Sequence, residues 1–166
     1  LKAIARDEYV RFIVGNFSKF GKSIAESEAG AVYDFFGGHT FYVQKTFNES
    51  FADTPQGDSC TMDTIRTAIS ALIDSYDTVF REILSNVPEK QKELLYAIAL
   101  DGEASAITSS AFIRRHSLSS ASSVQAAAKK LLEKELVTMN QKTYSVSDRF
   151  FGLWIAMQTG PSNPLS

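Results

Sequence analysis

Apolar residues recur three and four positions apart through the first half of the chain, which is the spacing of amphipathic helices. The polar segment 52–60 interrupts the pattern and predicts a loop. Gly37–Gly38 ends one helix, Thr61 or Asp63 is a candidate cap for another, and a bend is expected near Tyr76. The pattern predicts helices over 3–20, 23–36, 41–51 and 61–84. We therefore expect a small all-helical domain in this half.

After Pro88 the pattern changes from helices alone to helices followed by a hairpin. Helices are predicted over 89–100, 109–116 and 121–135, and strands over 136–139 and 143–146. Asn140–Lys142 forms the turn, 105–108 is a short extended piece, and the aromatic segment 150–157 docks on the core. Three helices and a hairpin are the order of a winged helix-turn-helix. The predicted fold is mainly α: a helical bundle over 1–86, a winged helix over 87–160 and a loose tail over 161–166.

The third predicted helix of the second half carries candidate DNA-binding residues. Its apolar stripe contains Val124, Ala128, Leu131 and Leu132. Glutamine can pair with adenine, and lysine can contact guanine or phosphate. Basic residues that end the preceding helix or occupy the hairpin turn are placed to contact the DNA backbone. The candidate DNA-contacting set is Arg114, Arg115, Ser122, Gln125, Lys129, Lys130 and Lys142.

A second interpretation of the same residues needs no DNA. Serine, alanine and glutamine are ordinary on an exposed helix face, and Lys129–Lys130 precede Glu133–Glu135 at spacings that favour local ion pairs. Arg114 and Arg115 also complement the dipole at a helix C-terminus. Winged helices can serve as protein-interaction modules, so this alternative stays open.

Composition and charge limit the kinds of protein to which this chain can belong. The chain has 166 residues, 44% of them hydrophobic, so it has enough apolar side chains to fold. The net charge is −2, with 8 basic against 12 acidic residues over 1–88 and 9 against 7 over 89–166, which places the positive surface in the second half. A single cysteine, Cys60, and the lack of a membrane-length apolar run favour the cytoplasm. The first residue is Leu1, and we expect further sequence upstream.

The known catalytic motifs are missing. The nearest approach to a phosphate-binding loop, Gly15–Ser23, has five residues between its glycines where the motif has four, and no buried strand precedes it. His39, His116 and Cys60 are too few and too scattered for a zinc site. We therefore expect no catalysis, and no bound cofactor or metal, from this chain alone.

The order of several short runs is similar to that in the archaeal-type P-loop ATPases, relatives of the AAA+ and STAND groups that also occur in bacteria. The similar runs are 9–17, 21–24, 37–44, 91–99, 109–113, 118–124, 131–137 and 144–154. The resemblance covers nearly the whole chain. It implies that residues 1–86 are the helical lid that follows a nucleotide-binding core, and that the winged helix follows the lid.

The resemblance also implies a function. The chain would be the non-catalytic C-terminal part of an ATPase that needs ATP and magnesium when complete, with Gly38, His39 and Thr40 near the nucleotide. Thr40 stands where the family usually has proline, and the two glycines also suit a simple helix end. The expected partners are duplex DNA, the protein's own ATPase core or a second copy, and no membrane. The alternatives are a free-standing winged-helix transcription regulator and a pure protein-interaction module.

Overall fold

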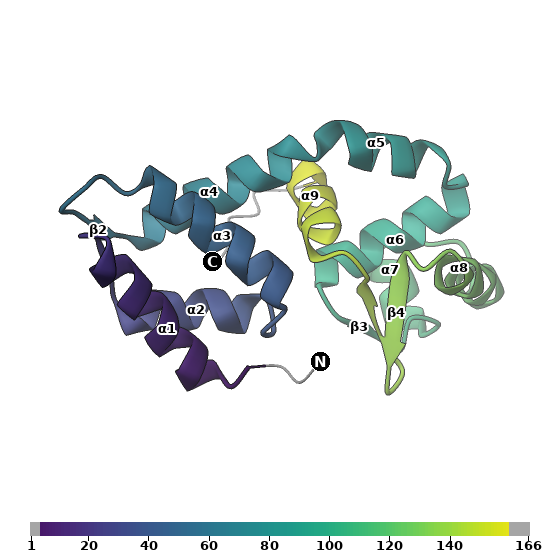
Figure 1. The fold of residues 1–166 in the computed structure, drawn as a ribbon. Helices are drawn as coiled ribbons and strands as arrows, with labels where there is room; N and C mark the ends of the chain where they lie inside the picture. Colours follow the sequence, from purple (N-terminus) through teal and green to yellow (C-terminus); the bar gives the residue numbers. More distant parts are fainter. Residues whose placement is uncertain (1–3, 160–166) are drawn as a thin grey trace. The chain divides into compact units, whose positions relative to one another are not determined.

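The computed structural model describes residues 4–159, so the predicted tail over 161–166 lies outside the described residues (Figure 1). The chain divides into two compact units, with the division between Ser75 and Tyr76. The sequence placed this boundary later, between residues 86 and 87. The mainly helical fold, with a hairpin in the second unit, agrees with the predicted fold class.

The described part of the first unit contains four helices and one short parallel strand pair. The elements are α1 (Arg6–Lys19), β1 (Ser23–Ile24), α2 (Glu26–Phe35), α3 (Thr40–Asp53), β2 (Ser59–Cys60) and α4 (Met62–Ser75). Helix α1 packs against α2, and α3 packs against α4. Fully buried aliphatic side chains at Ile65, Ile69 and Ile73 give α4 a continuous apolar face toward this core.

The strand pair corrects two sequence predictions. The predicted helix over 23–36 begins only at Glu26, because Ser23 and Ile24 form β1, and the predicted loop over 52–60 contains β2. The amide of Ser23 donates to the Asp58 carbonyl at 3.0 Å, and the Gly57 amide donates to the Gly21 carbonyl at 2.9 Å. Pairing between segments so far apart leaves no periodic signal in a two-residue strand.

The ends of α1 and α2 follow the glycine-terminated pattern that the sequence predicts. Gly21 and Gly37 both adopt positive φ, and the residue after each donates a hydrogen bond five positions back, to Phe17 and Tyr33 respectively. Gly38 has a further steric reason: a Cβ atom there would lie 2.7 Å from the Tyr33 hydroxyl. The Gly37–Gly38 pair is therefore required to end α2.

The second unit has the order of a winged helix, with one additional helix at each end. The elements are α5 (Asp77–Ser85), α6 (Glu89–Asp101), β3 (Ala104–Ser105), α7 (Ser110–Arg115), α8 (Ala121–Glu133), β4 (Val137–Asn140), β5 (Thr143–Val146) and α9 (Arg149–Thr159). The strands form an antiparallel sheet in the order β3-β5-β4. Helix α6 packs against α8, α9 and β5 and is thus the centre of this core.

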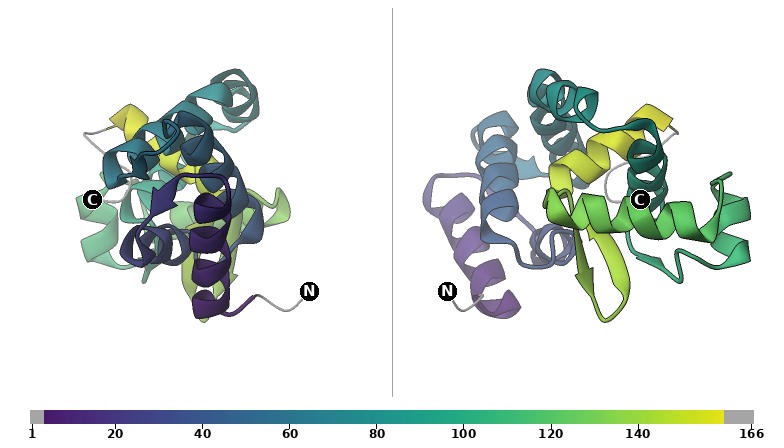
Figure 2. Two further views of the ribbon diagram at one scale, coloured as in Figure 1. Left: turned by 60° about the vertical axis from the view of Figure 1, so that its left-hand side comes forward. Right: turned by 90° about the vertical axis from the view of Figure 1, so that its right-hand side faces the viewer.

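The hairpin has a tight two-residue turn. Asn140 pairs with Thr143, and the two residues between them, Gln141 and Lys142, have φ of 47° and 66°. Positive φ at both central positions is the geometry of a type I′ turn, which matches the twist of the strands. The tip extends beyond the helices of this unit, as the right view of Figure 2 shows.

An aromatic cluster attaches α5 to α9, within the second unit. Phe80 lies 5.1 Å from Phe151 and 5.7 Å from Trp154, measured between ring centroids. The indole nitrogen of Trp154 donates to Asp77 at 2.9 Å, and Arg81 donates to the same carboxylate at 2.8 Å. The aromatic segment predicted to dock on the core is therefore helix α9, and its partner α5 explains why the division falls before Asp77.

The end of α8 yields a prediction about stability. Glu135 has φ of 58°, a conformation that disfavours side chains with a Cβ, and the turn hydrogen bond from Leu136 to Leu131 holds it there. Replacing Glu135→Gly should raise the free energy of unfolding by about 1 kcal/mol in a urea titration. Glu133→Gly, two residues earlier inside α8, should lower it. A loss of stability in both variants would contradict the assigned turn.

The pair Asp77–Trp154 yields a prediction about acid stability. Hydrogen bonds from Arg81 and then from Trp154 hold the pKa of Asp77 below its ordinary value. Its stabilising contribution is therefore complete above the unfolded-state pKa and is lost as pH falls through the lower folded-state pKa. The stability difference between wild type and Asp77→Asn should shrink below about pH 4. Fluorescence of the only tryptophan during unfolding measures it, and a difference independent of pH would contradict the assignment.

Candidate nucleic-acid interface

Two serine caps define the helices at the candidate interface. Ser109 accepts a hydrogen bond from the Phe112 amide, and Ser120 accepts one from the Ser123 amide, both at 3.2 Å. These side chains satisfy amides that a helix start leaves unpaired. Between the helices, Ser117 adopts φ of 54° and the Leu118 amide donates to the Ile113 carbonyl at 2.9 Å. The chain is thus turned from α7 into α8 by defined hydrogen bonds.

Helix α8 buries one face and exposes the other. The buried residues are Val124, Ala127, Ala128 and Leu131. The sequence predicted this stripe with two differences: it omitted Ala127, and it included Leu132, which is only half-buried. The buried face packs on α6, and the small side chains of Ala127 and Ala128 let the two helices lie close together.

The exposed face of α8 carries three of the predicted DNA-contacting residues at helical spacing. Ser122, Gln125 and Lys129 are all exposed, and Ala126 between them adds no bulk. Among the described residues, Lys129 has no ion pair and the Gln125 amide has no hydrogen-bond partner. We name Ser122, Gln125 and Lys129 the reading face. It offers a hydroxyl, an amide and an ammonium group along a single line.

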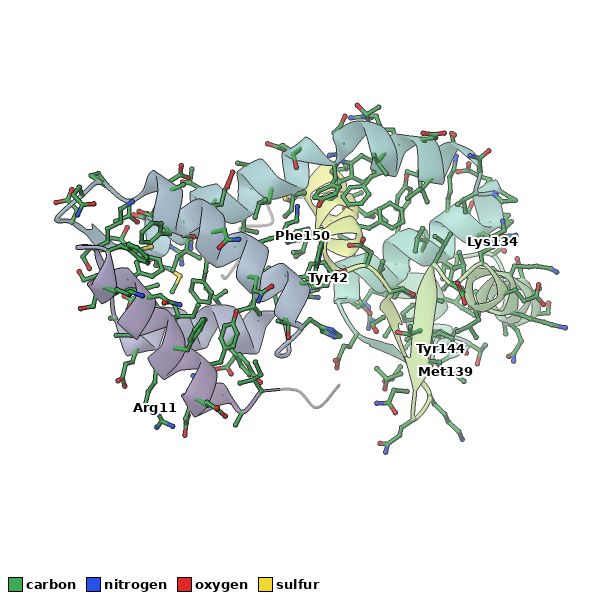
Figure 3. The ribbon with its side chains drawn as sticks, in the orientation of Figure 1. Arg11, Tyr42, Lys134, Met139, Tyr144 and Phe150 are labelled. Atoms are coloured by element: carbon green, nitrogen blue, oxygen red, sulfur yellow. The ribbon has the colours of Figure 1, made fainter. Side chains whose placement is uncertain are left out.

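The neighbouring lysines differ from Lys129. Lys130 donates to the Glu133 carboxylate at 2.7 Å, and this hydrogen bond lowers the pKa of Glu133. Lys134 donates instead to the Gln91 side chain at 2.8 Å (Figure 3). Lys130 was predicted as a DNA contact, but in this structure its charge is already paired on the surface of α8.

The two arginines at the end of α7 also differ. Arg115 pairs with Asp101 at the end of α6, donates to His116 at 3.3 Å and lies over the Phe112 ring. His116 also contacts the Asp101 carboxylate, at 3.0 Å. Arg114 is exposed and has no ion pair within the described residues. Of the predicted pair, Arg114 is therefore the cation available to a phosphate.

The cluster of Asp101, Arg115 and His116 is the feature that sequence reasoning missed. Fourteen positions separate Asp101 from Arg115. Side chains of one helix meet when they are three or four positions apart, so only the folded contact between α6 and α7 brings these two charges together. Lys130 with Glu133 differs, since the sequence already showed the favourable spacing.

The hairpin provides one exposed cation. Lys142 lies at the tip and has no ion pair among the described side chains. A hydrogen bond of 2.9 Å between the side chains of Ser105 and Thr143 ties β3 to β5 below the tip. Met139, half exposed, and Tyr144 occupy paired positions on the two strands of the hairpin (Figure 3). Arg114, Lys129 and Lys142 are thus the unpaired cations of the predicted set.

The nucleotide-proximal residues implied by the family resemblance lie in the first unit. Gly38 follows α2, His39 caps the start of α3 without a side-chain hydrogen bond, and Thr40 is the first residue of that helix. Each position is explained by the helix end alone. Cys60 is buried, and burial raises the pKa of its thiol, so it is not an accessible nucleophile.

Two searches of the described residues concern other kinds of site. Residues 4–159 contain no group of three or more histidine, cysteine or acidic side chains that could hold a metal ion. No helix within that range has the length and apolarity needed to cross a membrane.

Comparison with known proteins agrees with the fold of the second unit. Residues 78–157 match the family model described as "Probable winged helix domain". The match begins in α5 and ends in α9, so it includes both helices that flank the three-helix and hairpin order. The chain therefore contains a winged-helix domain, as predicted. No curated protein and no solved structure matches the chain.

Proposed function

We propose that the winged-helix domain binds double-stranded DNA, with α8 in the major groove. The observation that carries the proposal is the exposed reading face along the outer side of α8, where Gln125 and Lys129 have no partner among the described residues and the Ser122 hydroxyl contacts only that of Ser120, at 3.2 Å. Gln125 has the amide needed to pair with adenine, and Lys129 can reach guanine or a phosphate. Small residues, Ser122 and Ala126, let the helix approach the groove closely.

Arg114 and Lys142 would flank the reading face as contacts to the DNA backbone. Arg115 and Lys130 contribute little, because each would have to break an existing ion pair first. Three available cations predict modest, salt-sensitive affinity rather than tight binding. The net charge of −2 agrees with a modest affinity, because a chain with net negative charge has no general attraction for DNA.

We also propose that this DNA-binding module belongs to an ATP-dependent switch. The proposal is supported by the family resemblance and by the order of a helical unit followed by a winged helix. In it, ATP and magnesium bind an upstream core, and the first unit acts as the lid, in the cytoplasm. The chain described here contributes no catalytic group to that reaction.

A protein-interaction role is the second candidate, and a specific observation favours it. Arg115 and Lys130, two of the five basic residues of the candidate DNA-contacting set, already form ion pairs within the domain. A surface with so few free cations suits a protein partner as well as a nucleic acid. Binding to duplex DNA separates the two roles, and the salt slope of that binding counts the phosphates contacted.

The DNA proposal predicts a defined salt dependence. With three phosphates neutralised, the affinity for mixed-sequence duplex DNA should fall with a logarithmic slope of about −2.7, or about 40-fold between 50 and 200 mM salt. Fluorescence anisotropy of the full chain with labelled duplex measures it. Absence of binding at 50 mM salt would favour the protein-interaction role.

Neighbouring lysines provide a matched pair for the same titration. Lys129→Ala should weaken binding several-fold and reduce the salt slope by about 1, because it removes an unpaired cation. Lys130→Ala should change both much less, because this ammonium group is already bound to Glu133. Equal effects of the two substitutions would contradict the proposal that the reading face contacts DNA.

The ATPase proposal predicts the sequence that precedes Leu1. That sequence should encode a buried strand followed by Gly-x-x-x-x-Gly-Lys-Ser/Thr, and protein that includes it should bind Mg-ATP. Sequencing upstream and measuring nucleotide binding by calorimetry test this. An upstream region without that motif would leave a free-standing winged-helix regulator as the remaining DNA-binding interpretation.

A further inference from the structure

A groove of about 460 Å³ runs along the surface of the first unit, between α1 and α3. Its aromatic walls and floor come from both helices: Phe12, Phe17, Phe20, Phe47 and Phe51. On α1 the lining residues recur from Tyr9 to Phe20 at helical spacing, which gives a length of about 16 Å. The groove is therefore long enough for about three turns of a second helix.

The rim of this groove is unusually apolar for a surface. Phe12 is 58% exposed and Phe20 is 57% exposed, although both have buried neighbours on the same helix. Exposed aromatic side chains beside a concave surface are typical of an interaction site rather than of a core. Phe20 packs edge-on against Phe51 with 6.0 Å between the ring centroids, so the two rings close one end of the groove.

Polar groups along the groove make no hydrogen bonds of their own. The carboxamides of Asn16, Gln44 and Asn48 line it, and none has a partner within the described residues. Each offers two donors and an acceptor to the polar side chains of a bound segment. No acidic side chain lines the groove.

Cations gather at the closed end and along α1. The Lys22 ammonium lies 4.0 Å from the Phe51 ring centroid, and that of Lys19 lies 5.6 Å from the Phe20 centroid. Arg11, by contrast, extends from the outer side of α1 into solvent (Figure 3). Neither lysine has an ion pair among the described side chains, and the Lys22 ammonium also donates to the Phe51 carbonyl at 2.6 Å.

The other arginines of this unit show the contrast. Arg6 pairs with Asp34 at 2.7 Å, and Arg66 pairs with Asp63 at 3.2 Å. The first unit is acidic on balance, yet the ammonium groups of Lys19 and Lys22 lie over two of the rings that line the groove. Its surface therefore offers positive charge where it also offers apolar area.

We propose that this groove binds an amphipathic helix with aromatic or leucine anchors at i, i+4 and i+7 and acidic residues beside them. The anchors would contact Phe12, Phe20 and Phe51, and the carboxylates would pair with Lys19 and Lys22. The partner is a protein segment, and the inference is independent of DNA binding by the second unit.

Charge favours this occupant over two others. An isologous dimer through the same face would offer Lys19 and Lys22 no carboxylate, because no acidic side chain lines the groove of the second copy. Single-stranded nucleic acid requires cations that follow its backbone, whereas Lys19 and Lys22 are confined to one end of the groove. A helix with acidic residues near one end matches the distribution.

A displayed library of random 16-residue peptides, selected on the full chain, tests the proposal. Counter-selection uses the double variant Phe12→Ser, Phe20→Ser, whose changes lie at exposed positions; circular dichroism confirms that it is folded. The expected result is an enriched set with a net negative charge and apolar residues at helical spacing. Enrichment of basic or neutral peptides, or none relative to the variant, would overturn the proposal.

Anisotropy titration of an enriched peptide then distinguishes binding in the groove from nonspecific binding. The double phenylalanine variant should bind at least tenfold more weakly, and Lys19→Glu with Lys22→Glu should weaken binding about fivefold, less so in high salt. Phe41→Ser is the matched control: Phe41 is 57% exposed on α3 but does not line the groove, so affinity should be unchanged. Equal losses in all variants, or displacement of the peptide by single-stranded DNA or by self-association, would contradict the assigned site.

Discussion

The winged-helix domain depends on the contact between α6 and α8. Leu94, Leu95 and Leu131 are completely buried there, and the small side chains of Ala127 and Ala128 let the two helices approach closely. This packing fixes the rotation of α8 about its own axis. Because Val124 and Leu131 must face α6, Gln125 and Lys129 must face solvent. The packing of the core therefore determines which side chains of α8 are available to contact DNA.

Ion pairing then decides which surface charges remain available. Sequence patterning treats Lys129 and Lys130 alike, and Arg114 and Arg115 alike. In the fold, Glu133 pairs with Lys130 and Asp101 pairs with Arg115, while Lys129 and Arg114 have no ion pair within residues 4–159. Exposed pairs of this kind add little to stability. Their effect is on recognition, because they restrict the positive surface around α8 to a few isolated cations.

Periodicity predicted most of the fold, since long helices and a hairpin with adjacent turn residues leave local signals. Helices α6, α7 and α8 lie where the pattern predicted them, and Gln141–Lys142 forms the turn of the hairpin, as expected. Periodicity could not reveal β1 and β2, whose pairing joins Ile24 to Cys60, or the contact of Asp101 with Arg115. Both depend on distant segments meeting. Only the fold shows that Phe12 and Phe20 border a groove.

The most direct test of the account is a map of amide chemical shifts in the full chain, recorded by NMR as short duplex DNA is added. The account predicts that the largest changes fall on residues 122–129 of α8, on Arg114 and on the hairpin tip around Lys142. Residues of α1 and α3 should change little. Changes centred away from α8, or none at low salt, would contradict the assignment of α8 as the DNA-reading helix.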